Sequence, residues 1–232
     1  MGAVVLGGVT EIPRGRLTGW AGLVVVLAAV AYAARIAGGA PERNLLYHYS
    51  TAVGAVIQFG VIAVVLLVLA HGLDLMEVVG LNRPQSWPRG LGLAAAGLAA
   101  IWVVGLALSP FLDAGKDQGL VPDRWEPSHA GAYAANFAVV VLVAPLVEET
   151  VFRGFGMSAI ALHFGPAVAV AVTALGWGLT HGLTAGLPIL VAFGVILGVV
   201  RLRTGSVLPG MVTHATFNAI ALVSAVTVSA AS

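Results

Sequence analysis

The chain has 232 residues, of which 59% are hydrophobic and only 9% are charged. A soluble domain carries about 25% charged residues, so this composition excludes an ordinary water-soluble protein and indicates an integral membrane protein. The 11 Lys and Arg residues against 10 Asp and Glu give a net charge of +1, which provides no basic surface for nucleic acid. The absence of cysteine excludes disulfides, thiolate nucleophiles and cysteine metal sites.

Three long apolar runs occupy the first half of the chain. A helix needs about 20 apolar residues to cross the bilayer, and the runs predict spans at 17–36, 51–70 and 91–112. The polar start at 11–16 is followed by no small-residue cleavage pattern, so we expect the first span to be a retained anchor rather than a signal peptide. Most of the charged residues fall in the loops between these spans.

The second half of the chain contains apolar stretches with polar residues inside them. We expect spans at 130–147, 165–181, 188–202 and 207–229, with a short separate helix at 150–163. The fold class is therefore an all-α, polytopic transmembrane bundle of about seven or eight helices. It should form a single membrane domain with N-terminal helices and loops at 1–129 and a helical core at 130–232, and the polar residues place the functional site in this core. Gly194 and Gly198 form a GxxxG pattern that could seat a neighbouring helix closely.

The distribution of basic residues gives no orientation in the membrane. The positive-inside rule compares Lys and Arg between alternate loops, and here the two sets are equal. One set contains Arg14, Arg16, Arg83 and Arg89, and the other contains Arg35, Arg43, Lys116 and Arg124.

Two adjacent glutamates end the predicted span at 130–147. An ionisable residue inside a membrane span is costly and is a functional hypothesis by default. Arg153 lies four residues after Glu149, one helical turn away on the same face, so Glu149 is its expected ion-pair partner. Glu148 points about 100° around the helix from Glu149 and is therefore the candidate general base.

Two histidines and an amide complete the candidate site. His181 ends the span at 165–181, and His214 and Asn218 lie four residues apart on one face of the last predicted helix. A glutamate, two histidines and an amide can activate a water and stabilise an oxyanion. A single buried His or Asn often makes only an interhelical hydrogen bond, so the joint occurrence carries the hypothesis.

Three ordered motifs in the region of about 140–222 resemble a known protease family. Pro145 and the sequence Glu148-Glu149-Thr150-Val151-Phe152-Arg153 resemble the EExxxR motif of the CAAX protease and bacteriocin-processing family, known as CPBP or Abi. Its eukaryotic members are the type II CAAX prenyl endopeptidases. The FxxxH motif falls on Trp177 to His181 with Trp in place of Phe, and the third motif falls on His214 and Asn218.

The resemblance implies an intramembrane endopeptidase in which Glu148, assisted by His181, activates the hydrolytic water. His214 and Asn218 would stabilise the oxyanion, and Glu149 with Arg153 would support the site. The family has been described both as metalloproteases and as glutamate-dependent proteases. If a metal such as zinc is present, Glu148, His181 and His214 are the candidate ligands, although the chain has no HExxH motif.

Three alternatives to this mechanism differ in the residues they require. A rhomboid-like serine protease would use Ser158, which would leave the glutamates and Asn218 without roles. Aspartyl chemistry is disfavoured because the aspartates fall in predicted loops, at Asp74, Asp113, Asp117 and Asp123. A non-enzymatic membrane protein, such as a bacteriocin immunity protein or a proton-coupled carrier, could use the same buried Glu and His residues.

The expected partners are the lipid bilayer and a peptide or membrane-protein substrate. The family resemblance allows prenylated peptides, bacteriocin or pheromone precursors, or a membrane protein. The composition is rich in Ala, Val and Gly, which favours a GC-rich bacterial source. We therefore expect a multi-pass protein of a bacterial cell membrane, acting on a bacterial peptide.

Overall fold

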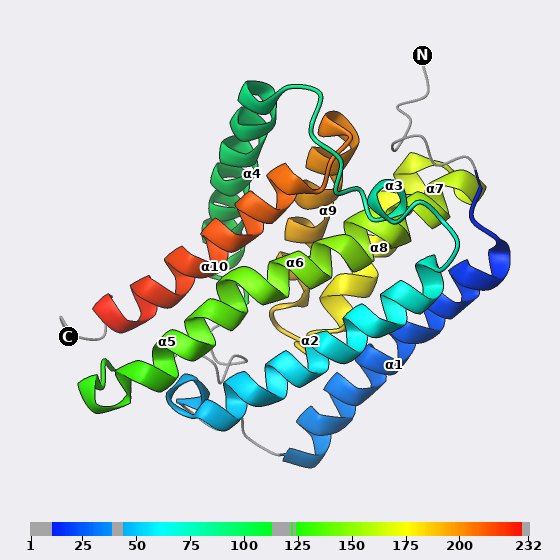
Figure 1. Cartoon of the computed structure of the whole chain (residues 1–232). Helices are drawn as coiled ribbons and strands as arrows, with labels where there is room; N and C mark the ends of the chain where they lie inside the picture. The colour runs from blue at the N-terminus through cyan, green and yellow to red at the C-terminus, as the bar shows by residue number, and fades with distance from the viewer. Residues whose placement is uncertain (1–10, 39–43, 113–121, 123, 229–232) are drawn as a thin grey trace.

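The computed structural model describes residues 11–38, 44–112, 122 and 124–228, and within these residues the chain forms helices and no strands. The helices form one bundle (Figure 1). The predicted all-α transmembrane bundle is confirmed. Some residues named in the sequence analysis lie outside the described ranges, and these are Arg43, Asp113, Lys116, Asp117 and Asp123.

The first half of the chain forms the three predicted spans and one short helix. Helix α1 covers Arg14–Gly38, α2 covers Tyr49–Ala70 and α4 covers Trp87–Leu108. A single 3-10 turn, η1 (Leu45–Tyr47), precedes α2. The short helix α3 (Leu75–Val78) begins after Asp74, whose carboxylate accepts a hydrogen bond from the Glu77 backbone N–H at 3.2 Å. This is the usual N-cap arrangement, which gives Asp74 a structural role.

The fourth span is longer than the sequence predicts. A continuous helical stretch covers Pro127–Phe164, 38 residues in all. It consists of η3 (Pro127–His129), α5 (Ala130–Ala138), the π-helical segment η4 (Val139–Val143), α6 (Ala144–Glu149), the π-helical segment η5 (Thr150–Gly156) and α7 (Met157–Phe164). Figure 1 shows this stretch running through the bundle, and α2 and α10 both contact it.

The prediction of a separate short helix at 150–163 was therefore wrong. The adjacent charges of Glu148 and Glu149 suggested the end of a span, but the Glu149 side chain is completely buried and paired with Arg153. A paired, buried charge does not need to reach water, so the helix continues past it. Among the described residues, six helices are long and apolar enough to cross a membrane, and α8 (Pro166–Leu179) is shorter.

The first π-helical segment has a clear local cause. Pro145 has no backbone N–H to donate, and the N–H of Ala144 bonds to the carbonyl of Val139. The carbonyl of Val140 consequently accepts no backbone hydrogen bond from Ala144 or Pro145. The side-chain amide of Asn218 donates to it at 2.9 Å instead, as a buried backbone carbonyl requires.

Side chains from two other helices bond to the second π-helical segment. The Trp20 indole of α1 donates to the carbonyl of Val151 at 3.0 Å. The Nε of Arg201 donates to the carbonyl of Arg153 at 3.2 Å. The backbone N–H of Met157 donates to the carbonyls of Phe152 and Gly154 instead of to this one. The irregular segments are thus fixed by donors from neighbouring helices, as membrane helices with broken registers require.

The last two spans are α9 (Leu187–Thr204) and α10 (Leu208–Val228). The GxxxG pattern on α9 seats α8, as the sequence predicts. A Cβ atom at Gly194 would lie 2.8 Å from the Cα atom of Ala174, and one at Gly198 would lie 3.1 Å from a methyl of Val170. Only glycine therefore permits this approach of α8 to α9, which holds the second motif against the rest of the core.

Candidate active site

The Glu149–Arg153 ion pair lies at the centre of the core. The two residues are one turn apart across the junction of α6 and η5, and their side chains are 3.1 Å apart. Both side chains have no exposed surface. The expected pairing is therefore present, and its burial explains why the two charges occur together: either one alone would be left uncompensated.

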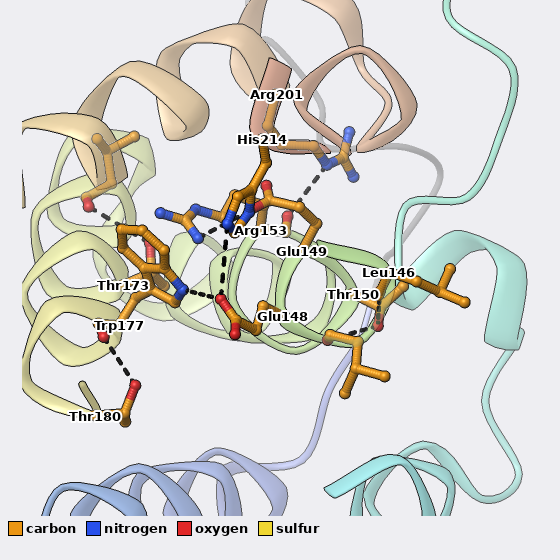
Figure 2. Close-up of polar contacts among 12 residues, drawn as sticks. Leu146, Glu148, Glu149, Thr150, Arg153, Thr173, Trp177, Thr180, Arg201 and His214 are labelled. Atoms are coloured by element: carbon orange, nitrogen blue, oxygen red, sulfur yellow. Dashed lines mark hydrogen bonds and ion pairs between the residues drawn. The ribbon is translucent and has the colours of Figure 1, made fainter. Parts of the chain in front are cut away.

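His214 of α10 links the two glutamates. Its Nδ1 lies 3.1 Å from the same Glu149 oxygen that accepts from Arg153. Because a carboxylate oxygen accepts, Nδ1 carries the proton, and Nε2 faces the carboxylate of Glu148 at 4.0 Å. Figure 2 shows His214 reaching toward both carboxylates. Its side chain is almost completely buried.

Glu148 faces α8 rather than Arg153. The indole Nε1 of Trp177 donates to Glu148 Oε2 at 2.5 Å, and the contact is drawn in Figure 2. The guanidinium carbon of Arg153 lies 4.7 Å from the centre of the Trp177 ring. Trp177 therefore touches both charged motif residues with different parts of one side chain. The Glu148 side chain is 17% exposed, whereas that of Glu149 is fully buried.

His181 is oriented by the helix that carries it. Its Nδ1 lies 2.8 Å from the carbonyl of Trp177, one turn earlier. The carbonyl can only accept, so neutral His181 carries its proton on Nδ1 and keeps the lone pair of Nε2 free to accept. The ring also packs edge-on against the Trp177 indole, with 4.6 Å between centroids.

Glu148 and His181 line one pocket of about 140 Å³. The pocket brings together the first and second motifs with the N-terminal helices. Its lining residues are Leu27, Gln58, Phe59, Ile62, Glu148, Val151, Phe152, Thr180 and His181. A carboxylate and an imidazole acceptor facing the same space can take a proton from a water held there.

The other two candidate residues do not line this pocket. His214 stands behind Glu148, and Asn218 bonds to the backbone of Val140 from a half-buried position on α10. Of the four candidate residues, the pocket is thus lined by Glu148 and His181 alone. None of the four is exposed on the outer surface of the bundle.

Sequence reasoning missed two features of the site. In the second motif Trp177 stands in place of Phe, and the motif alone does not show that the indole N–H, which Phe lacks, contacts Glu148. Gln58 belongs to no motif, although it is the only polar residue between positions 52 and 70. A polar residue alone in a strongly apolar run is the signal that could have identified it.

The described residues do not provide a ready metal site. No group of three or more His, Cys, Asp or Glu side chains in this part of the chain could hold a metal ion. Because the Nδ1 atoms of His181 and His214 are already bonded within the protein, only their Nε2 atoms could bind a metal. The candidate zinc ligands Glu148, His181 and His214 do not converge on one three-ligand site as they stand.

Ser158, the nucleophile of the serine-protease alternative, is 1% exposed and does not line the pocket. Its hydroxyl has no hydrogen-bond partner among the described residues. A serine nucleophile needs both a base and access to substrate. The structure provides Ser158 with neither.

Comparison with known families gives a match over the second half of the chain. Residues 130–220 match the family of type II CAAX prenyl endopeptidases described as Rce1-like. The match extends from α5 into α10 and includes Glu148, Glu149, Arg153, Trp177, His181, His214 and Asn218, so it confirms the resemblance drawn from the motifs. No curated protein and no solved structure gave a significant match. Six long apolar helices among the described residues indicate a multi-pass membrane protein, and residues 130–220 of this chain are similar to the CAAX endopeptidase family.

Proposed function

We propose that this protein is an intramembrane endopeptidase that hydrolyses a peptide bond with a water activated by Glu148 and His181. The observation that carries the proposal is the pocket that both side chains line. The family match supports the same class of reaction. The completely buried Glu149–Arg153 pair and His214 hold Glu148 from behind.

The reaction follows from the chemistry of these groups. A water in the pocket gives its proton to the Glu148 carboxylate, and its oxygen attacks the carbonyl carbon of the scissile bond. His181 accepts a hydrogen bond from this water through Nε2. Collapse of the tetrahedral intermediate breaks the C–N bond, and protonated Glu148 gives the proton to the leaving amine. Oxygen from water ends in the new carboxylate, with no acyl-enzyme.

Two residues of α10 are the proposed oxyanion donors. The third motif carries this assignment, because neither side chain lines the pocket itself; His214 lies beside it, with Nε2 4.0 Å from Glu148 Oε2. Asn218 lies one turn further along the helix, and its amide has a second N–H besides the one bonded to Val140. Donors of this kind typically lower a reaction barrier by about 2 to 4 kcal/mol.

The proposed substrate is a peptide or protein segment in the membrane. The site lies in helices long and apolar enough to cross a bilayer, so a substrate reaches it from the lipid phase. A bacterial cell membrane and a bacterial peptide fit the composition. Prenylated C-terminal peptides, the substrates that the family name indicates, are the first compounds to test.

Reconstituted protein and internally quenched peptides test the proposal. Purified protein in liposomes is incubated with farnesylated and unmodified peptides, and cleavage is followed by fluorescence. Glu148→Gln should abolish cleavage while the protein stays folded, and Ser158→Ala should retain at least half of the rate. An active Glu148→Gln protein beside an inactive Ser158→Ala protein would overturn the mechanism.

Two further outcomes separate the alternatives. Binding of peptide without cleavage by the wild-type protein would support the immunity-protein or carrier alternative. A rate that falls with a chelator and returns with zinc would keep the activated water but assign its activation to a metal. We expect no chelator effect, because the described residues form no three-ligand group.

A further inference from the structure

Gln58 is a single amide in an otherwise apolar stretch of helix α2. From position 52 to 70 every other side chain is apolar or glycine. Gln58 lies near the middle of α2, which covers Tyr49–Ala70, so it lies at the depth of the hydrocarbon core. A polar side chain at this depth is costly and needs a partner.

The described part of the chain offers the Gln58 amide no hydrogen bond. No hydrogen bond joins its side chain to any residue that the structure describes, and Gln58 is exposed rather than buried between helices. Interhelical contact, the usual explanation for an amide in a membrane helix, therefore does not apply. Its partner must come from outside the described chain.

The Gln58 side chain faces the pocket that Glu148 and His181 line. The N-terminal helices supply one wall of this pocket, through Leu27 of α1 and through Gln58, Phe59 and Ile62 of α2. That wall is apolar except for Gln58. It lies outside the residues that match the endopeptidase family, 130–220. The catalytic groups and this wall therefore come from different parts of the chain.

We propose that Gln58 and this wall form a binding subsite for an extended, apolar peptide segment. A side-chain amide has one acceptor and one donor group that match the C=O and N–H of a peptide bond. Gln58 thus pairs with the substrate backbone whatever its sequence, and the apolar wall selects an apolar side chain beside the scissile bond. The inference rests on the proposed endopeptidase function and gives it a substrate class.

The binding experiment uses the Glu148→Gln protein, which should bind peptide without cleaving it, in lipid nanodiscs. The probe is a fluorescent, membrane-soluble peptide of Leu, Val and Ala, and its dissociation constant is measured by anisotropy. Gln58→Leu in the same background should weaken binding about three- to tenfold, the value of one or two hydrogen bonds. Val61→Leu, an exposed position one turn along α2, is the matched control and should leave binding unchanged.

A second probe identifies the backbone contact. In this probe ester bonds replace the backbone amides, which removes the N–H donors and keeps the side chains. Gln58→Leu should then weaken binding of the ester probe less than binding of the amide probe. A probe with Lys in place of the central Leu should bind at least tenfold more weakly. Equal binding of the amide probe with and without the Gln58→Leu change, or no binding of this probe at all, overturns the subsite.

The outcomes for the subsite and for the function can be separated. Cleavage that needs Glu148 but has the same KM in Gln58→Leu and wild-type proteins would keep the endopeptidase and reject the subsite. Binding that depends on Gln58 without any cleavage by the wild-type protein would keep the subsite and reject the endopeptidase. Both the subsite and the endopeptidase function hold if Gln58→Leu raises KM with kcat nearly unchanged, because this pattern indicates lost ground-state binding.

Discussion

At the scale of single residues, two neighbouring glutamates have different surroundings. Glu149 is completely buried and contacts Arg153 and His214, whereas Glu148 is partly exposed to the pocket and contacts Trp177. The helical turn causes the difference, because adjacent residues point about 100° apart. One carboxylate therefore faces only protein, and the other also faces the space where a substrate would lie.

Glu149→Gln should destabilise the protein, and Glu148→Gln should not. The Glu149 replacement leaves the Arg153 guanidinium buried without a charged partner, and breaking a buried pair costs about 3 to 5 kcal/mol. Thermal unfolding in detergent, followed by circular dichroism, measures the difference between the variants. Equal loss of melting temperature in the two variants would contradict the assignment of Glu149 to structure and Glu148 to chemistry.

Trp177→Phe should lower kcat for peptide cleavage without strongly lowering the thermal stability of the protein. Phe fills most of the same space but lacks the N–H that bonds to the Glu148 carboxylate. A hydrogen bond to a charged group is worth about 1.5 to 3 kcal/mol, so kcat should fall about 10- to 100-fold with KM little changed. Trp87→Phe, at an exposed position on α4, is the matched control.

A spectroscopic measurement separates this positioning role from simple packing. The indole N–H proton of Trp177 should resonate at low field in the wild-type protein and move upfield in Glu148→Gln, because the bond to a charged oxygen is lost. A Trp177 indole resonance that does not respond to Glu148→Gln would show that Trp177 acts only by filling space.

At the scale of elements, the long helix owes its shape to donors from its neighbours. Both π-helical segments have carbonyls that accept bonds from other helices: Trp20 of α1, Arg201 of α9 and Asn218 of α10. Glycine also matters here, since a Cβ atom at Gly154 would collide with the carbonyl of Val79. The loop after α3 therefore packs directly on the first motif. These contacts fix the angle at which Glu148 and Glu149 leave the helix.

Part of this element-scale arrangement could be predicted from the sequence. The length of each apolar run predicts the spans at α1, α2, α4, α9 and α10, because bilayer thickness sets helix length. Pro145 signals an irregular helix, but sequence alone does not show which side chain supplies the missing donor. Asn218 therefore suggested an oxyanion donor on motif spacing, whereas its contact with Val140 depends on tertiary packing.

At the scale of the whole molecule, the site combines both halves of the chain. The motifs predict Glu148 and His181 as neighbours because the family pattern pairs them, and they do line one pocket. The contribution of α1 and α2 was not predictable, since apolar runs look alike and only packing shows which faces meet. Leu27 and Phe59 carry no motif, yet they form part of the wall opposite the catalytic groups.

A fragment covering residues 122–232 should therefore fail to form a stable site, although it contains every family motif. The fragment lacks Trp20, whose ring lies against Gly156 and whose N–H bonds to Val151, and it lacks the α2 wall of the pocket. It would expose the buried faces of α6 and α8, and the carbonyl of Val151 would lose a side-chain donor. Size-exclusion chromatography and thermal unfolding in detergent should show an aggregated or non-cooperative fragment beside a monodisperse full chain. Addition of a separately expressed fragment of residues 1–112 should restore cooperative unfolding. A fragment of 122–232 that melts at the temperature of the full chain would show instead that the core is independent of the N-terminal helices.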